Sequence, residues 1–202
     1  GSTGKLKNEV AAELCALLAF AAIKNNDKVG LIVFTDCIEL FIPPGKGLSH
    51  VLRLIREVLN FRPRQAQTNI SEALDYFGRV MTKRSVVFLV SDFLGEGFEK
   101  RMRVLAKKHD LVAVSVTDPR EVRMPNVGLI ELEDAETGEL IVIDTGSARV
   151  RHRYETLGAE QGAALRNLFR SVGVDHVEVL TDQDYVRNLV TFFRTRERRA
   201  SR

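Results

Sequence analysis

Residues 85–93 read Ser-Val-Val-Phe-Leu-Val-Ser-Asp-Phe, and this stretch decides the fold class. A run of apolar and β-branched residues without polar alternation is typical of a strand that is buried on both faces of a parallel sheet. The run ends at Ser91 and Asp92, and a glycine-containing loop follows it. Open α/β sheets bind ligands at the carboxyl ends of their strands, so Asp92 stands where a functional carboxylate is expected.

The rest of the chain alternates helices and strands in the order of a doubly wound α/β domain. Apolar periodicity predicts helices at about 5–25, 49–59, 69–81, 98–108, 148–172 and 184–194, and strands at 29–34, 37–42, 85–91, 111–116 and 176–180. We therefore expect a mostly parallel sheet with helices on both faces, in a single domain over residues 1–202.

Two strand pairs depart from the parallel pattern. A short connection joins 29–34 to 37–42, which predicts an antiparallel edge strand that Pro43 and Pro44 end. The turn-forming residues 134–138 separate two further short strands and predict a β-hairpin insertion at about 126–145.

Composition limits the function classes. The 202 residues are 45% hydrophobic and 28% charged, as in ordinary globular domains, with a net charge of +3. Arginines gather at positions 194, 196, 198, 199 and 202, and we interpret them as a solvated tail, with no nucleic-acid partner. Binding of nucleic acid through these arginines stays a third possibility, with a steep salt dependence as its signature.

The cysteines and the apolar segments bear on location. Cys15 and Cys37 show no paired spacing, which indicates a reducing compartment, and we expect a cytoplasmic protein without a zinc site. No signal peptide is visible. The longest apolar stretch, Leu14–Ile23, is too short to span a bilayer, so no membrane segment is expected in this chain.

Several stretches together resemble a known domain family. They are Asn26–Asp36, Ile42–Gly47, Thr68–Ile70 with Glu72–Leu74, Ser91–Phe93, His109–Asp110, Asp118–Glu121, Asp134–Glu139 and Thr181–Tyr185. They resemble a von Willebrand factor A-like domain, and more closely the bacterial family called domain of unknown function 58, often found beside MoxR-type AAA+ ATPases. The resemblance covers nearly the whole chain and implies a Rossmann-like fold of the von Willebrand factor A type.

This resemblance also implies a site. Such domains usually carry a metal-ion-dependent adhesion site, in which three loops hold Mg²⁺. Thr68 and Asp92 match the ligands of the second and third loops, and hydroxyl and carboxylate oxygens suit this ion. The Asp-x-Ser-x-Ser motif of the first loop is absent, so the resemblance implies that the intact protein binds Mg²⁺ and that this fragment does not.

Other polar residues can stand beside these ligands. We expect Ser91 and Asn69 next to the ligands, and Asp36, Asp118 and Glu121 on the rim. Each candidate also has an ordinary explanation: Thr68 or Asn69 caps a helix, Asp92 accepts from backbone amides, Asp36 ends a strand and Asp118 starts a turn.

The same resemblance places a further strand at the centre of the sheet, between 29–34 and 85–91. No strand-like run precedes Leu6, so we expect a C-terminal fragment of a longer protein, with the first central strand missing. The gap is then closed by direct pairing of the two strands, or by a strand from another chain, which makes a homo-oligomer possible.

Two function classes fit these observations. The first is a non-enzymatic protein-interaction module that works with a MoxR-type AAA+ ATPase in the assembly or maturation of other proteins. The alternative is a metal-dependent hydrolase with Asp92 as ligand or nucleophile. It ranks lower because no general base is placed beside Asp92, and because the four histidines, His50, His109, His152 and His176, are scattered.

Overall fold

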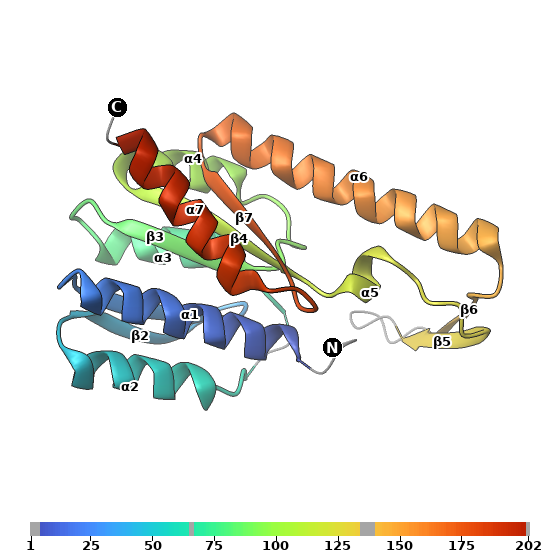
Figure 1. Ribbon diagram of the computed structural model, residues 1–202, viewed down its shortest axis with the longest axis horizontal. Coiled ribbons are helices and arrows are strands. Elements are labelled where there is room, and N and C mark those ends of the chain that lie inside the picture. The colour runs from blue at the N-terminus through green and yellow to red at the C-terminus, as the bar shows by residue number, and fades with distance from the viewer. Residues whose placement is uncertain (1–4, 65–66, 134–139, 201–202) are drawn as a thin grey trace.

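The protein is described by a computed structural model that covers residues 5–64, 67–133 and 140–200. Its helices are α1 (Lys7–Lys24), α2 (Leu48–Leu59), α3 (Ile70–Val80), α4 (Glu99–Lys108), α5 (Pro119–Val122), α6 (Ala148–Val172) and α7 (Tyr185–Ala200); its strands are β1 (Val29–Phe34), β2 (Ile38–Gly45), β3 (Val86–Ser91), β4 (Asp110–Thr117), β5 (Leu129–Glu133), β6 (Leu140–Asp144) and β7 (Asp175–Leu180). The predicted α/β class is confirmed (Figure 1). None of the described helices is long and apolar enough to cross a membrane.

The main sheet is parallel, with the strand order β3-β4-β7. Val86 lies opposite Asp110, and Val112 lies opposite Asp175. β4 is the central strand, and its residues Leu111–Val116 are at most 5% exposed. An uninterrupted apolar strand is stable here because helices cover both faces and strands flank both edges.

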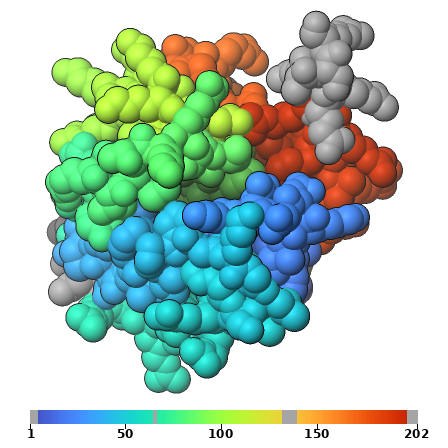
Figure 2. All heavy atoms as spheres, turned by 90° about the vertical axis from the view of Figure 1, so that its left-hand side faces the viewer, coloured from blue at the N-terminus to red at the C-terminus, as the bar shows by residue number. Residues whose placement is uncertain are grey.

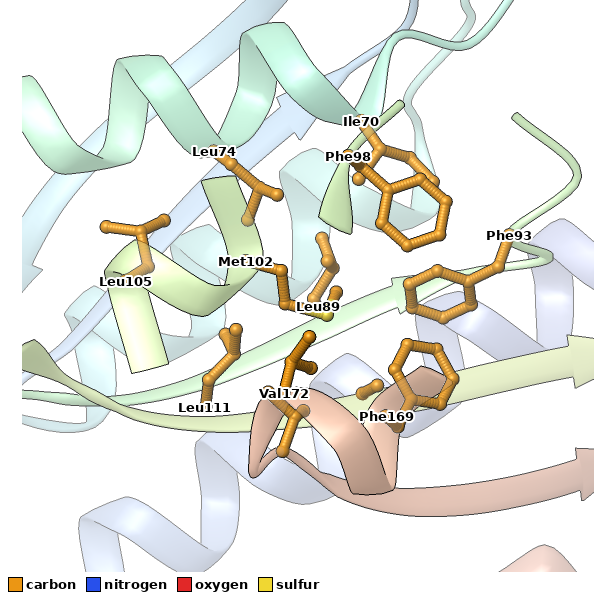
Figure 3. Packing of buried hydrophobic residues seen from close by; sticks show 12 residues of the cluster. Ile70, Leu74, Leu89, Phe93, Phe98, Met102, Leu105, Leu111, Phe169 and Val172 are labelled. Atoms are coloured by element: carbon orange, nitrogen blue, oxygen red, sulfur yellow. The ribbon is translucent and has the colours of Figure 1, made fainter. Parts of the chain in front are cut away.

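Each face of this sheet has its own core. On one face, Val10 and Leu14 of α1 pack with the even-numbered valines of β4 and with Tyr185 and Leu189 of α7. On the other face, residues of α3, α4 and α6 pack together over β3 and β4 (Figure 3). Phe169 of α6 is fully buried there. The alternation of side chains along β4 places one helix layer on each side.

β1 and β2 form a separate antiparallel pair, as expected for the edge of the sheet. β2 continues through Pro43 and Pro44 to Gly45, so the prediction that these prolines end the strand is wrong. An edge strand tolerates proline because the missing N–H faces no partner strand. Gly30 of β1 allows this fit, since a Cβ there would lie 3.0 Å from the carbonyl oxygen of Ile42.

β1 and β3 are not hydrogen-bonded to each other, so the expectation that they pair directly is wrong. Among the described residues, no strand stands between them. Helices α1 and α3 contact both β1 and the core of the main sheet, and they connect the two parts of the fold. The break in the sheet lies where the family resemblance implies a further central strand.

The other differences concern helix ends. α2 begins at Leu48 after Gly47, so Ser49 lies inside the helix and does not cap it. α7 continues to Ala200, past the predicted end at Arg194. Arg196 extends it, since its guanidinium contacts Asp110 and lies 3.2 Å from Oδ2 of Asp175. β5 and β6 form the predicted antiparallel pair, and the turn predicted at 134–138 lies outside the described residues.

Candidate functional site

The carboxyl end of β3 is shaped by Phe93. This residue has a left-handed backbone, with φ of 56°, which a non-glycine residue adopts only when its surroundings enforce it. The Phe93 ring is 3% exposed and packs against Phe98 and Phe169 (Figure 3), which holds the strained turn. The turn leaves Asp92 at the edge of the sheet. One carboxylate oxygen of Asp92 accepts from the amide of Leu94 at 3.3 Å.

The neighbouring strand β4 also ends in carboxylates. Asp118 is the residue before α5, and its side chain accepts from the amide of Arg120 at 2.9 Å. Glu121 completes a capping box, because its Oε2 accepts from the amide of Asp118 at 3.3 Å. The other oxygen of Glu121 is directed to a residue of α1.

That residue is Lys7, which joins the two strand ends. Its ammonium lies 3.2 Å from Oδ2 of Asp92 and 2.6 Å from Oε1 of Glu121. Burial alone would lower the pKa of Lys7, but the hydrogen bond to Glu121 and the charges of Asp92 and Glu121 outweigh burial and raise this pKa. Lys7 is therefore a cation at neutral pH, held between two carboxylates.

The loop before α3 lies beside this cluster. Asn69 caps α3, since its side chain accepts from the amide of Glu72 at 3.0 Å. Ser71 of the same segment donates to the carbonyl of Gly97 at 3.2 Å. A Cβ on Gly95 would lie 3.8 Å from the carbonyl oxygen of Thr68. The loops before α3 and after β3 are therefore in contact.

The structure brings most predicted site residues to one edge. Thr68 and Asp92 line one cavity, and Thr68 is exposed. Ser91 accepts from the amide of Phe93 at 3.2 Å, which is a turn-forming role. Asp36 is exposed and accepts from the hydroxyl of Thr35 at 3.2 Å, next to the point where the Thr35 carbonyl accepts from the Asn69 amide.

Lys7 is the site residue that sequence reasoning missed. A signal was present, because a lysine at the first position of a helix meets the positive end of the helix dipole. Such a placement is unfavourable without nearby anions, and here Asp92 and Glu121 supply them.

A comparison with protein families assigns the chain. The family model described as "Protein of unknown function DUF58" matches residues 1–164. The chain belongs to the DUF58 family. An uncharacterized protein of Mycobacterium avium is 30% identical to it over 162 residues, which cover 79% of this chain and 95% of that protein.

Longer relatives also match. An uncharacterized protein of Mycobacterium tuberculosis is 25% identical over 197 residues, which cover 96% of this chain and 62% of that protein. The chain thus spans less than two thirds of that relative. The crystal structure of the conserved hypothetical protein BatB from Bacteroides thetaiotaomicron has a TM-score of 0.55 at 19% identity, and covers 91% of this chain and 84% of BatB. This likeness shows the fold alone.

The residues that the structure describes supply only some of the ligands that a Mg²⁺ ion needs. Thr68 and Asp92 offer a hydroxyl and a carboxylate, the oxygen ligands that Mg²⁺ prefers. In the described part of the chain, no three His, Cys, Asp or Glu residues converge in a way that could hold a metal. The ammonium of Lys7 contacts Asp92 in addition. These residues alone therefore do not fit a complete Mg²⁺ site.

A second polar contact lies inside the DUF58 core. The hydroxyl of Ser115 is 2.8 Å from Nε2 of His176, whose Nδ1 lies 3.8 Å from Glu178. Ser115 is 5% exposed in the middle of β4, and the ring of Phe169 lies 4.6 Å from that of His176. Burial lowers the pKa of His176, which makes it a neutral imidazole at pH 7. We interpret this contact as structural, because no substrate reaches the hydroxyl.

Proposed function

We propose that this chain is a protein-interaction module that binds its partner through the carboxyl edge of the sheet and catalyses no reaction. The observation that carries the proposal is the cluster of Lys7, Asp92 and Glu121, in which carboxylates from two strand ends meet a cation at a partly exposed surface. Their side chains are 31–39% exposed. A partner can therefore reach the cluster without entering a deep pocket.

The surroundings of Asp92 favour binding over hydrolysis. A hydrolase that uses Asp92 needs a neutral base nearby to accept a proton. The neighbour of Asp92 is the ammonium of Lys7, whose raised pKa keeps it protonated at neutral pH. An ammonium between carboxylates instead suits the recognition of a charged protein surface.

We also propose that Mg²⁺ takes part in binding the partner. In the longer protein, Thr68 and Asp92 would hold Mg²⁺ together with the Asp-x-Ser-x-Ser residues that the family resemblance implies. The ion would bind an acidic side chain of the partner, and the chain's own role would be to present the hydroxyl and the carboxylate. Because Lys7 contacts Asp92, we expect Lys7 and Mg²⁺ to compete for this carboxylate.

The proposed partner is a MoxR-type AAA+ ATPase, as the family resemblance implies, in the assembly or maturation of other proteins. The proposed location is the cytoplasm. Free thiols at Cys15 and Cys37 support a reducing compartment.

Binding of a purified MoxR-type ATPase, with and without Mg²⁺, tests the proposal. We expect Asp92→Asn to weaken binding about tenfold, which corresponds to about 1.4 kcal/mol. Asp75→Asn is the matched control, because Asp75 is 41% exposed and pairs with Arg101 on another surface. Equal binding by the Asp92→Asn variant and the unchanged chain would contradict the role of the carboxyl edge.

A further inference from the structure

The β5–β6 hairpin exposes large apolar side chains to solvent. The exposed fractions are 72% for Leu129, 63% for Leu140, 51% for Ile141 and 65% for Val142. In the described part of the chain, the main neighbour of each of these strands is the other one, and no helix packs broadly against the pair. A two-stranded hairpin alone is at best marginally stable in water. An apolar hairpin of this kind therefore indicates an interaction surface.

One face of this hairpin combines apolar and acidic residues. Leu129 lies opposite Asp144, and Glu131 lies opposite Val142. Cross-strand partners share a face, and residues two apart along a strand do so too, so these four side chains stand on one face. Glu131 and Asp144 are exposed, and neither takes part in an ion pair with another described residue. The hairpin face, as we call these four residues, is thus apolar and negatively charged.

A groove of about 440 Å³ lies between α3 and α4. Leu74 and Leu105 line it from the buried core, and Val104 adds an apolar side chain that is 58% exposed. Gly78 also lines it, and a Cβ at this position would lie 3.3 Å from Cδ2 of Leu105. A side chain in place of Gly78 would therefore narrow the space between the two helices. The α3–α4 groove, as we call it, offers apolar surface to a partner.

The charge of this groove is positive. α4 has lysine or arginine at positions 100, 101, 103, 107 and 108, and Glu99 is its acidic residue. Lys100, Arg101 and Lys108 line the groove together with one carboxylate, Asp75. Oδ2 of Asp75 lies 2.6 Å from Nε of Arg101. Within the described residues, this pairing leaves the ammonium groups of Lys100 and Lys108 without an ion pair.

The hairpin face and the α3–α4 groove are complementary. The hairpin face presents carboxylates beside leucine and valine, and the groove presents unpaired ammonium groups beside valine and leucine. Interfaces of this kind combine apolar contact with opposite charges. Nucleic acid fits the groove less well, because proteins bind single strands with cations and stacking aromatic rings, and no described aromatic residue lines the groove.

The two surfaces lie at different ends of the molecule. The hairpin projects beside the start of α6, far from the region where α3 packs against α4 (Figure 1). Figure 2 shows the molecule from the end opposite the hairpin, where the segments coloured green to yellow-green, which include α4, form the upper left part of the surface. The hairpin face can therefore reach the α3–α4 groove of another copy and not its own.

We propose that the chain associates head to tail with a second copy of itself, through the hairpin face of one copy and the α3–α4 groove of the next. Each pair keeps one free surface at either end, so the association continues into short chains of copies. Two surfaces of this size belong to the small, transient class of interface, and we expect a Kd of about 10 µM. The proposal does not rest on the carboxyl-edge function, because neither surface includes Lys7, Asp92 or Glu121.

Sedimentation velocity from about 1 µM to about 300 µM tests this association. We expect the mean mass to rise past that of a dimer, and to rise less at high salt. Val142→Lys on the hairpin face and Lys100→Glu in the groove should each raise the Kd at least about tenfold. Leu59→Lys and Arg153→Glu are the matched controls, because both residues are exposed outside the two surfaces, and they should leave the Kd unchanged.

A mixture of the two defective proteins separates lost contact from lost folding. The Val142→Lys protein keeps its groove, and the Lys100→Glu protein keeps its hairpin face. Each should stay monomeric alone at concentrations where the unchanged chain associates. Their equimolar mixture should form a dimer that grows no further, because the remaining groove and hairpin face of that dimer are the defective ones.

Four outcomes would overturn the proposal. The first is a monomeric unchanged chain at every concentration. The second is growth of the unchanged chain that stops at a dimer, which assigns a symmetric contact between two hairpins. The third is association that Val142→Lys abolishes and Lys100→Glu leaves intact, which places the hairpin on another surface. The fourth is a mixture of the two variants that stays monomeric.

Discussion

β4 and β1 are similar in sequence and differ in environment. β4 carries Leu111-Val-Ala-Val-Ser-Val116, and β1 carries Val29-Gly-Leu-Ile-Val-Phe34. Every one of these β4 residues is buried, whereas no residue of β1 is. The difference lies in their neighbours, because β4 has a strand on each side and β1 has β2 on one side and the break in the sheet on the other. An apolar strand is buried only when the sheet is closed around it.

The sharpest test of this comparison removes the same side chain from each strand. Leu111→Ala in β4 should lower the free energy of unfolding by about 3 kcal/mol, because Leu111 is 3% exposed in a packed core. Leu31→Ala in β1 should cost about 1 kcal/mol, since Leu31 is half-buried beside the break in the sheet. Urea unfolding measures both. Equal costs would mean that β1 is packed as fully as β4 in solution.

The second test concerns the charged residues at the carboxyl ends of β3 and β4. Lys7→Met leaves Asp92 and Glu121 without their shared cation and should destabilise the protein by about 1.5 kcal/mol at low salt. The matched control is Lys5→Met, because Lys5 is 48% exposed and pairs with Glu13, and it should cost a few tenths of a kcal/mol. If the proposed Mg²⁺ site forms once the Asp-x-Ser-x-Ser residues are present, Lys7→Met in that form should also bind Mg²⁺ more tightly in a calorimetric titration. Unchanged stability together with unchanged Mg²⁺ affinity would contradict a role for Lys7 in the site.

The cap of helix α3 is expected to contribute less to stability. Asn69→Ala removes the cap of α3 and should cost about 1 kcal/mol, whereas Asn69→Ser should cost a few tenths because serine also caps. Urea unfolding measures these changes, and binding of the ATPase should stay the same. Loss of binding in both variants would give Asn69 a recognition role in place of the capping role.

A change in pH is expected to have the smallest effect on the free energy of unfolding. Burial lowers the pKa values of His109 and His176 below 6.5, so the unfolded chain binds more protons than the folded chain as pH falls through 6.5. Stability should therefore decrease on acidification from neutral pH and level off below the folded-state pKa values. The groups that face His176 are Ser115, Glu178 and Arg166.

A variant series assigns this pH dependence. Urea unfolding at several pH values should give a flatter profile for His176→Asn. The exposed His152 is the control, and His152→Asn should keep the profile of the unchanged chain. Identical profiles for all three proteins would place the acid sensitivity elsewhere.

Local patterns predicted much of the fold. The range 148–172 of α6 was predicted correctly, because Ser147 stands before it and Gly173, at φ of 72°, ends it. The three-and-four spacing of apolar residues in α1 predicts that Leu17 and Ala21 lie on its inner face, yet both are exposed. Helical periodicity marks an apolar face of the helix, and it carries no information on which elements of the fold cover each residue of that face.

The positions of the candidate residues could be predicted from the sequence only in part. Asp92 is expected at the sheet edge because it ends an apolar run, and Thr68 because the family resemblance matches it to a second loop at that edge. The link from Lys7 to Asp92 and Glu121 joins segments 85 or more residues apart, and no local pattern encodes it. Likewise, the contacts of Arg196 with Asp110 and Asp175 extend α7 through tertiary pairing, which a helix-end rule does not include.

The length of α6 has a consequence for the shape of the protein in solution. Its 25 residues span about 37 Å, whereas the six residues of β7 span about 20 Å. The buried residues of α6 are Phe169 and Val172, near its end, and its earlier part extends past the sheet toward α5 and the β5–β6 hairpin (Figure 1). The molecule is thus asymmetric, and small-angle X-ray scattering should give a radius of gyration above the value of about 16.5 Å for a compact chain of 202 residues.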